Sequence, residues 1–369
     1  MMKTPTDRRF FLWGLMVFAI MAILLPAPAL MAADHHGAHD HHGTPEDQGT
    51  ADNHGKVRGD AFSDPSQEMP MPDEWIKKPI EYDNEVKGAD LSMMMDQDIY
   101  YTLLPIIQTF AQDNHLKIIV QEGSCGMVAG MLASKTIDMG GYCCPPSKDD
   151  RLPGLQFYTM GIVSKAFFVN PDNPIDNLTS AQLRDIYAGK LFRWSELKAQ
   201  TGKPGPGLAI KAVARLHCPK NPGHWRLLHN SGKKFSPYVS EVGSIPDMIA
   251  QVAGAKGAIG WEVMTMVEKN KNMGKVKPIK IDGYGPTDSK ALAALKYPFY
   301  RTYNLTIWTG KGVENKNARN LVSYMIKEFE KLNPDRFGFV SVSRLKKAGW
   351  KFKENELIGE PVPGHNGQM

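Results

Sequence analysis

The sequence predicts an α/β fold in which mixed, mainly parallel sheets are flanked by helices. Strand-type and helix-type patterns alternate from Ala89 onward, as they do in βαβ units. The chain has 369 residues, enough for two lobes, and its 42% hydrophobic content is that of a soluble globular protein. The net charge of +5 is mild and its Lys and Arg residues are dispersed. This charge gives no support for a nucleic-acid partner, and it is compatible with a basic cleft for an anion.

The N-terminus is predicted to be a targeting segment, residues 1–33. Arg8 and Arg9 precede an apolar run from Phe10 to Leu25, and this run is too short for a comfortable membrane span. The small residues of Pro26 to Ala33 follow and are typical of a cleavage site. The two arginines with the next three residues, Phe-Phe-Leu, resemble a twin-arginine export signal. We therefore expect a periplasmic or extracellular protein, with an uncleaved N-terminal membrane anchor as the alternative.

Residues 34–84 are predicted to form a disordered, His-rich linker. Asp34 to Gly55 has almost no apolar residues, so it cannot bury enough surface to offset the entropy of ordering the chain. Its histidines are His35, His36, His39, His41, His42 and His54. Neutral imidazole binds zinc, copper or nickel. The segment is thus either a solvated spacer or a loose collector of such ions.

The folded domain is predicted over residues 85–360 and begins with a βαβ pattern. The segment Asp96 to Asn114 is predicted to be a helix with Pro105 as a kink. Its apolar face is formed by Ile99, Leu103, Ile106 and Phe110. A strand at Leu116 to Val120, a helix at Met127 to Ser134 and a strand at Ile137 to Met139 are expected to follow.

The segment Asn170 to Leu197 carries the clearest local signals. Thr179 and Gln182 fit a capping box at a helix start, and Leu178 and Leu183 fit the hydrophobic staple around it. Gly189 supplies a left-handed helix stop. The segment is predicted to be an extended stretch, a short capped helix and a glycine exit.

The remaining elements continue the alternation of strands and helices. Before the capped segment, Phe157 to Asn170 is a long apolar run that we interpret as a strand passing from the first lobe to the second. After the capped segment the expected elements are a strand at Ile210 to Leu216, a helix at Ile245 to Ala253, strands at Gly257 to Val263 and Tyr303 to Trp308, and a helix at Asn315 to Leu332. From Phe337 onward the pattern is weak.

Three segments resemble bacterial phosphate ABC-transporter substrate-binding proteins. They are Asn170 to Leu197, the Gly-Ala-Ile-Gly strand of Lys256 to Trp261, and the Tyr-Pro-Phe-Tyr-Arg turn of Tyr297 to Arg301. The resemblance spans Ala89 to Leu332. It implies the two-lobed periplasmic binding protein fold with an interlobe cleft. The implied lobes are residues 85–160 with 265–360, and residues 161–264, followed by a tail at 361–369.

The resemblance also implies an exported solute-binding protein that holds phosphate or another small oxyanion and delivers it to a membrane permease. Such proteins bind the anion with backbone amides at helix N-termini and with Ser, Thr, Asp and Arg side chains. In this chain the implied contacts in the first two loops are Asp96, Gln97, Gly123, Ser124, Cys125 and Gly126.

The third and fourth loops depart from the family pattern. Cys143 and Cys144 replace a Ser-Arg pair, so a charged ligand is lost there. In the fourth loop the motif positions are taken by Gly223, His224 and Trp225, followed by Arg226. Arg226 or Lys220 would restore positive charge to the site.

All four cysteines of the chain, Cys125, Cys143, Cys144 and Cys218, fall on loops that this fold directs at the cleft. In an exported protein they could form two disulfides. A bond between Cys143 and Cys144 would be strained, so Cys125 and Cys218 would each take one of that pair. The alternative is a soft-metal or cofactor site.

In that alternative the ligands are Cys125, Cys143, Cys144, Cys218, His217 and His224, with Met93 to Met95 nearby. Thiolate, thioether and imidazole ligands favour copper, zinc or iron. The dipeptides Cys144-Pro145 and Cys218-Pro219 also suggest haem, but no Cys-x-x-Cys-His motif for covalent attachment is present. The disulfide alternative requires no cofactor, whereas the second alternative requires copper, zinc, iron or haem.

Motifs of common enzymes are absent from the sequence. There is no Gly-x-Ser-x-Gly, no phosphate-binding P-loop and no zinc-protease motif. His217 and Cys218 are neighbours, and adjacent residues of a strand point to opposite faces, so they do not form a catalytic dyad by themselves. We therefore expect a binding protein and not an enzyme.

Overall fold

The computed structural model describes residues 62–199, 201–216, 227–229 and 231–361. These residues belong to one compact unit of the chain. The predicted signal segment 1–33, the histidines of the linker and the tail beyond residue 361 lie outside this part. No helix in the described part is long and apolar enough to cross a membrane.

Ten strands of the described residues form one sheet, in the order β2-β1-β3-β11-β4-β8-β6-β7, with β9 and β12 also paired to β4. Their bounds are β1 Leu91–Asp96, β2 Ile118–Gly123, β3 Met139–Tyr142, β4 Leu155–Val169, β6 Lys211–Ala214, β7 Ser240–Glu241, β8 Ala258–Val263, β9 Lys277–Pro278, β11 Tyr300–Trp308 and β12 Phe339–Ser341. Two small sheets pair β5 Asn177–Leu178 with β10 Lys280–Ile281, and β13 Lys351–Lys353 with β14 Glu356–Gly359.

The predicted α/β class with mixed sheets and flanking helices is confirmed. Strands β1, β2 and β3 are parallel at one end of the sheet, and β6, β7 and β8 are parallel at the other. Strands β4 and β11 run antiparallel to each other and to the neighbours that join them to these groups. The long apolar run therefore forms the middle of a mixed sheet, and the sheet is parallel only toward its two ends.

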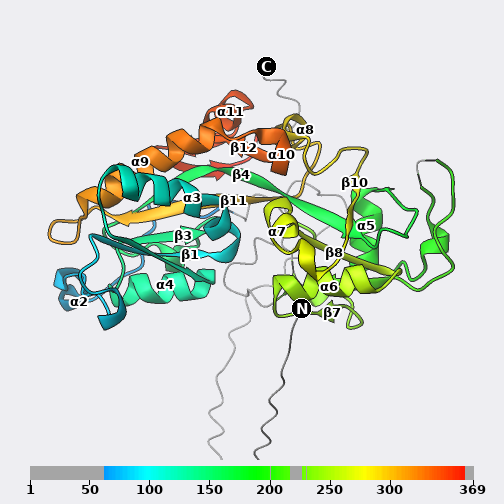
Figure 1. Ribbon diagram of the computed structural model, residues 1–369, viewed down its shortest axis with the longest axis horizontal. Coiled ribbons are helices and arrows are strands. Elements are labelled where there is room, and N and C mark those ends of the chain that lie inside the picture. Colours follow the sequence, from blue (N-terminus) through cyan, green and yellow to red (C-terminus); the bar gives the residue numbers. More distant parts are fainter. Residues whose placement is uncertain (1–61, 200, 217–226, 230, 362–369) are drawn as a thin grey trace, which may run out of the picture. The chain divides into compact units, whose positions relative to one another are not determined.

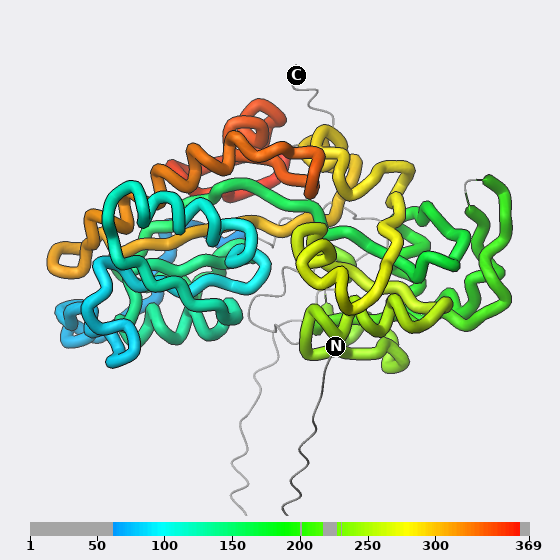
Figure 2. Tube along the Cα trace, in the orientation of Figure 1, coloured from blue at the N-terminus to red at the C-terminus, as the bar shows by residue number. Residues whose placement is uncertain are grey.

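Strand β4 changes its partners part of the way along its length. It pairs with β11 from Leu155 to Ser164 and with β8 from Lys165 to Val169. The change falls between two adjacent residues of one unbroken strand, which Figure 2 shows running through both halves of the unit. Each half has a parallel group of strands, and the two groups are joined through β4 without an intervening loop.

Helices flank the strands on both faces (Figure 1). Their bounds are α2 Asp73–Lys77, α3 Gln97–Asp113, α4 Cys125–Ser134, α5 Ser180–Tyr187, α6 Ile245–Gly254, α7 Met264–Lys269, α8 Ser289–Ala293, α9 Lys316–Lys331, α10 Pro334–Phe337 and α11 Val342–Lys347. Helix α3 buries Ile99, Leu103, Ile107 and Phe110, close to the predicted face. Ile106, one position earlier, is only half-buried.

The capped segment folds as predicted. Thr179 Oγ1 accepts from the Gln182 amide at 3.0 Å, and Gln182 Oε1 accepts from the Thr179 amide at 2.8 Å. Helix α5 ends at Tyr187, and Gly189 adopts φ +72°, a left-handed conformation that glycine takes without strain. Leu178 and Leu183 are both buried, as the hydrophobic staple requires.

The expectation of a disordered linker up to residue 84 is wrong for residues 62–84. This stretch contains α2, and the indole Nε1 of Trp75 donates to the Ala133 carbonyl at 2.6 Å. Lys135 Nζ donates to the carbonyls of Ile76 and Lys78 at 3.0 and 2.7 Å. The stretch folds because its spaced apolar residues pack against the core, namely Met69, Met71, Trp75 and Ile80.

His229 is buried, and its ring meets Phe235 edge-on at 4.8 Å in the hydrophobic core that also contains Tyr187 and Trp261. Burial, reinforced by the positive charges of Arg184, Lys234 and Lys190, lowers the pKa of His229 to about 4. An unfolded chain protonates this histidine near pH 6.5, so between pH 6.5 and 4 the unfolded state binds more protons than the folded state. Stability is therefore lost as the pH falls through this window.

We expect His229→Gln to remove up to about 3 kcal/mol of this acid destabilisation between about pH 7 and pH 4. Urea unfolding of the parent and the variant at several pH values measures the difference. His115→Gln changes an exposed histidine and serves as the control. The same pH dependence in parent and His229→Gln would contradict the assignment.

Candidate functional site

The carboxyl ends of β1, β2 and β3 lie side by side and bring the predicted contact loops together. In the parallel registers Asp96 pairs with Gly123, and Met95 pairs with Gly141. Helix α3 starts directly after β1, and α4 starts two residues after β2. Two helix N-termini and the loop after β3 therefore meet at one edge of the sheet.

The N-terminus of α4 presents groups that suit an anion. Ser124 caps the helix, its Oγ accepting from the Met127 amide at 3.3 Å. The amides of Cys125 and Gly126 occupy helix positions that have no intrahelical partner. A Cβ at Gly123 would lie 2.7 Å from Met94 Sδ, so a larger residue here would have to displace the Met94 side chain. Ser124 is partly exposed and Gly126 is exposed, whereas Cys125 is buried.

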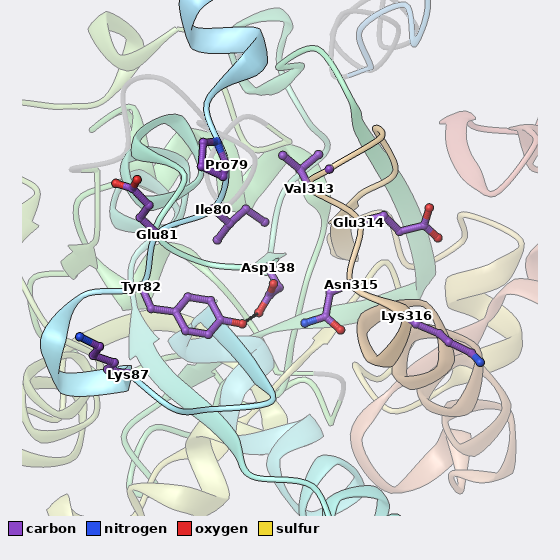
Figure 3. Close-up of a pocket in the computed structure, with 11 residues that line it drawn as sticks. Pro79, Ile80, Glu81, Tyr82, Lys87, Asp138, Val313, Glu314, Asn315 and Lys316 are labelled. Atoms are coloured by element: carbon purple, nitrogen blue, oxygen red, sulfur yellow. Dashed lines mark hydrogen bonds between the residues drawn. The ribbon is translucent and has the colours of Figure 1, made fainter.

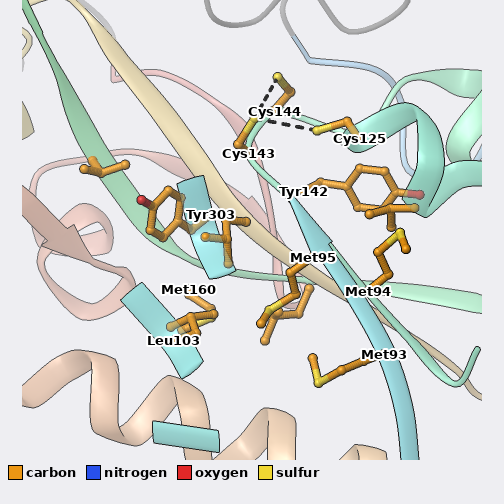
Figure 4. Packing of buried hydrophobic residues seen from close by; sticks show 14 of the residues in the cluster. Met93, Met94, Met95, Leu103, Cys125, Tyr142, Cys143, Cys144, Met160 and Tyr303 are labelled. Atoms are coloured by element: carbon orange, nitrogen blue, oxygen red, sulfur yellow. Dashed lines mark hydrogen bonds between the residues drawn. The ribbon is translucent and has the colours of Figure 1, made fainter. Parts of the chain in front are cut away.

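Cys125 also belongs to a buried group of three sulfurs, with Cys143 and Cys144 (Figure 4). Cys125 Sγ is 3.6 Å from Cys143 Sγ, and Cys143 Sγ is 3.8 Å from Cys144 Sγ. Cys125 and Cys143 are not in a disulfide. A disulfide joins sulfurs about 2.05 Å apart, so the predicted bridge from Cys125 to the Cys143-Cys144 pair is not present. Cys218, the other predicted bridging residue, lies outside the described residues.

Met93, Met94 and Met95 pack as ordinary core residues of β1. All three side chains are buried and belong to the hydrophobic core that also contains Leu103 and Val128. A Cβ at Gly141 would lie 2.6 Å from Met95 Cγ, so Met95 fills the space that the glycine leaves on the neighbouring strand. Figure 4 shows these three methionines apart from the three cysteines.

Six charged side chains are buried around the sulfurs, three of each sign: Asp96, Asp98, Glu262, Lys165, Arg215 and Arg301. Arg301 forms an ion pair with Asp98, and its Nη2 lies 4.0 Å from Glu262 Oε2. Arg215 Nη1 donates to Glu262 Oε1 at 2.6 Å. The formal charges cancel, and the side chains come from the β1–α3 junction, β4, β8, β11 and the segment after β6.

Burial changes the protonation of several of these groups. It raises the pKa of Asp96 above its usual value, even though the positive charge of Arg301 opposes the change. Burial also lowers the pKa of Lys165 to about 7, against the attraction of Glu262. Hydrogen bonds with the thiols of Cys125 and Cys144, together with burial, raise the pKa of Cys143 well above its usual value. The metal-free site therefore favours neutral thiols.

Six of the predicted contact residues are brought together here: Asp96, Gln97, Gly123, Ser124, Cys125 and Gly126. The fourth-loop residues lie outside the described residues: His217, Cys218, Lys220, Gly223, His224, Trp225 and Arg226. The sequence reasoning did not assign Asp98, Lys165, Arg215, Glu262 or Arg301 to the site. Three of them could have been predicted to be buried and paired, because Lys165, Glu262 and Arg301 are each the single charge in a largely uncharged strand.

A separate groove of about 560 Å³ lies at the opposite end of β3 (Figure 3). Asp138 on its floor accepts from the Ser92 amide at 2.8 Å and from the Tyr82 hydroxyl. Its other walls come from residues 79–82 and 312–316. None of the predicted contact residues lines this groove, so we treat the carboxyl ends of the strands as the candidate site.

A family model and several known proteins resemble this chain. Residues 99–328 match the family model described as PBP superfamily domain. The phosphate-binding protein PstS of Staphylococcus saprophyticus is 24% identical over 303 residues, which cover 75% of this chain and 86% of that protein.

Two solved structures share the fold. An ABC-type phosphate transport receptor from Vibrio cholerae has a TM-score of 0.53 at 19% identity, covering 68% of this chain and 99% of its own. A putative phosphate ABC transporter substrate-binding protein from Clostridium perfringens, solved with bound phosphate, has a TM-score of 0.56 at 16% identity with the same coverage. The names of these relatives refer to phosphate and not to metal or haem, so the metal alternative depends on the geometry of the cysteines.

Proposed function

The chain belongs to the PBP superfamily, and on this premise we propose that it is an exported solute-binding protein that binds a small oxyanion such as phosphate. The proposed site is the partly exposed N-terminus of α4 with the start of α3. The protein would deliver its anion to a membrane permease of the ABC type. The predicted export signal and the lobe boundaries are part of this proposal.

The observation that carries the proposal is the meeting of two helix N-termini at adjacent strand ends. Free amides and the positive end of the helix dipole favour an anion at such a place. Gln97, Ser124 and the amides of Cys125 and Gly126 are the proposed contacts. Three buried cations, Lys165, Arg215 and Arg301, are balanced by three acids, so they add positive groups to the site without adding net charge.

Calorimetry on the processed, metal-free protein with phosphate, sulfate, molybdate and arsenate tests the proposal. We expect one anion to bind each chain with measurable heat and to raise the melting temperature. No heat and no thermal shift with any of the four anions would contradict it.

We expect Ser124→Ala to weaken anion binding about tenfold or more, because a hydrogen bond to a charged group contributes about 1.5–3 kcal/mol. The substitution also removes a helix cap, which by itself costs about 1 kcal/mol of stability. Thr179→Ala is the matched control, because it removes the cap of α5 at a distant site. Equal anion affinity in Ser124→Ala and Thr179→Ala would exclude Ser124 as a contact.

A further inference from the structure

We propose that Cys125, Cys143 and Cys144 bind one soft metal ion, Cu⁺ or Zn²⁺. The first thiol comes from the first residue of α4 and the other two from the loop that follows β3. The three Sγ atoms all lie within 4.8 Å of one another. This inference is independent of the proposed anion site, because it uses buried side chains and not the exposed amides.

The spacing of the sulfurs is that of thiolates which share one ion. A tetrahedral zinc site with Zn–S bonds of about 2.3 Å places its sulfurs about 3.8 Å apart. Two of the three separations in this group are 3.6 and 3.8 Å. With the third at its upper limit of 4.8 Å, the point equidistant from the three sulfurs is about 2.4 Å from each, close to a metal–thiolate bond length.

Asp96 offers a fourth ligand. Its Oδ2 lies 3.5 Å from Cys125 Sγ, which is about the separation expected between oxygen and sulfur ligands of one tetrahedral ion. Asp96 and Cys143 also belong, with Asp98, to a second group whose ligand atoms lie within 4.8 Å. Asp96 therefore lies on the Cys125 side of the three sulfurs, where its carboxylate can complete the ligand set once an ion is bound.

Neighbouring groups would act on the thiolates that form when a metal ion replaces the thiol protons. Arg301 Nη1 lies 3.4 Å from Cys143 Sγ, where its positive charge offsets the negative charge of a thiolate. Asn304 Nδ2 donates to the Cys144 carbonyl at 2.8 Å and its Oδ1 accepts from Thr159 Oγ1 at 2.7 Å. These contacts hold the loop and resemble the outer hydrogen bonds that orient ligands in metal sites.

The simplest alternative is that the three thiols are small core residues. In that case Asp96 only caps α3 and Arg301 only pairs with Asp98, and the approach of both groups to within 3.5 Å of two buried thiols has no role. Thiolate ligands select Cu⁺ and Zn²⁺ over Mg²⁺ and Ca²⁺. Binding releases one proton from each of the three thiols to solvent and involves no oxidation or reduction.

The test uses the full chain in which the linker histidines His35, His36, His39, His41, His42 and His54 are replaced by glutamine, so that only the folded part can bind tightly. The reduced protein is titrated without oxygen with Zn²⁺, with Cu⁺ against a chromogenic chelator, and with Mg²⁺ as the hard-ion control. We expect one Zn²⁺ or Cu⁺ per chain, an ultraviolet thiolate-to-metal band and no binding of Mg²⁺. Which of the two ions binds more tightly identifies the metal.

Cys125→Ser, Cys143→Ser and Cys144→Ser are each expected to weaken binding at least about 100-fold, since each removes one of three thiolates. Met94→Leu, which replaces a core thioether on β1, is the control and should leave the affinity unchanged. Alkylation of the parent protein, with and without the metal, gives a second test that does not depend on whether the variants fold. The bound ion should protect Cys125, Cys143 and Cys144 from alkylation, as mapped by peptide mass spectrometry.

Equal metal affinity in the parent and the three serine variants would overturn the proposal. A Cys125–Cys143 disulfide trapped by alkylation in intact cells would also overturn it. Anion binding is measured by calorimetry on the metal-free protein and on Cys144→Ser, so the anion site is tested without a bound metal. Failure of the metal site therefore leaves the anion result standing, and the reverse also holds.

Discussion

Arg301→Met is expected to lower the free energy of unfolding by about 3–5 kcal/mol, because it leaves buried acidic side chains without their partner. The arginine is 5% exposed and pairs with Asp98, while Glu262 lies within 4.0 Å of its second nitrogen. Removing one partner of a buried ion pair leaves an uncompensated charge in the interior, and this costs more than the pair contributes. Urea unfolding measures the loss.

The double variant Arg301→Met with Asp98→Asn removes both charges, and we expect it to recover part of the lost stability. Arg319→Met removes an exposed arginine that pairs with Glu314 at 2.7 Å, and no measurable change is expected. The interpretation of Arg301 as a charge partner fails if the double variant is no more stable than Arg301→Met alone.

Glu356→Gln is expected to cost about 3 kcal/mol of stability through a second buried ion pair, the one between Arg151 and Glu356. Arg151 donates to both oxygens of Glu356, at 2.9 and 2.5 Å, and both side chains are buried. The guanidinium also donates to Ser63 Oγ at 2.9 and 3.0 Å. An amide accepts through only one oxygen, so the two-point contact is lost and the arginine keeps an unmatched charge.

Because Arg151 holds both Ser63 and Glu356, the same variant should loosen residues 62–84. Faster amide exchange in this stretch, together with the lowered unfolding free energy, is the expected pair of results. Glu268→Gln breaks an exposed pair with Lys271 and should change neither quantity measurably. Unchanged exchange in residues 62–84 would show that Arg151 does not hold this segment in place.

The parts of the fold that could be predicted are those whose signals are local. The capping box of Thr179 and Gln182 needs only neighbouring residues, and the structure reproduces both of its hydrogen bonds. The packed segment 62–84 could not be predicted in this way. Its few apolar residues fold only because Ala133 and Lys135, far along the chain, supply their partners.

In the candidate site, too, the features with local sequence signals could be predicted and those that depend on distant residues could not. The helix starts at Asp96 and Ser124 follow from local sequence, and the structure places them at adjacent strand ends. The charge pairs could not be predicted from local sequence, because Arg301 and Asp98 are far apart in the sequence and only the fold brings them together. A lone charge inside an apolar strand predicts that the charged residue is buried and paired, but it does not identify the partner.

Strand β4 has a mechanical consequence. Its 15 residues span about 50 Å, and they hydrogen-bond to one set of strands before Lys165 and to another from Lys165 onward. A rotation of one half of the sheet against the other has no flexible loop to bend at this point, because the backbone between the two halves is part of a β-strand. Such a rotation would include torsion of β4, and the change of partners falls at Lys165, the buried lysine of the site.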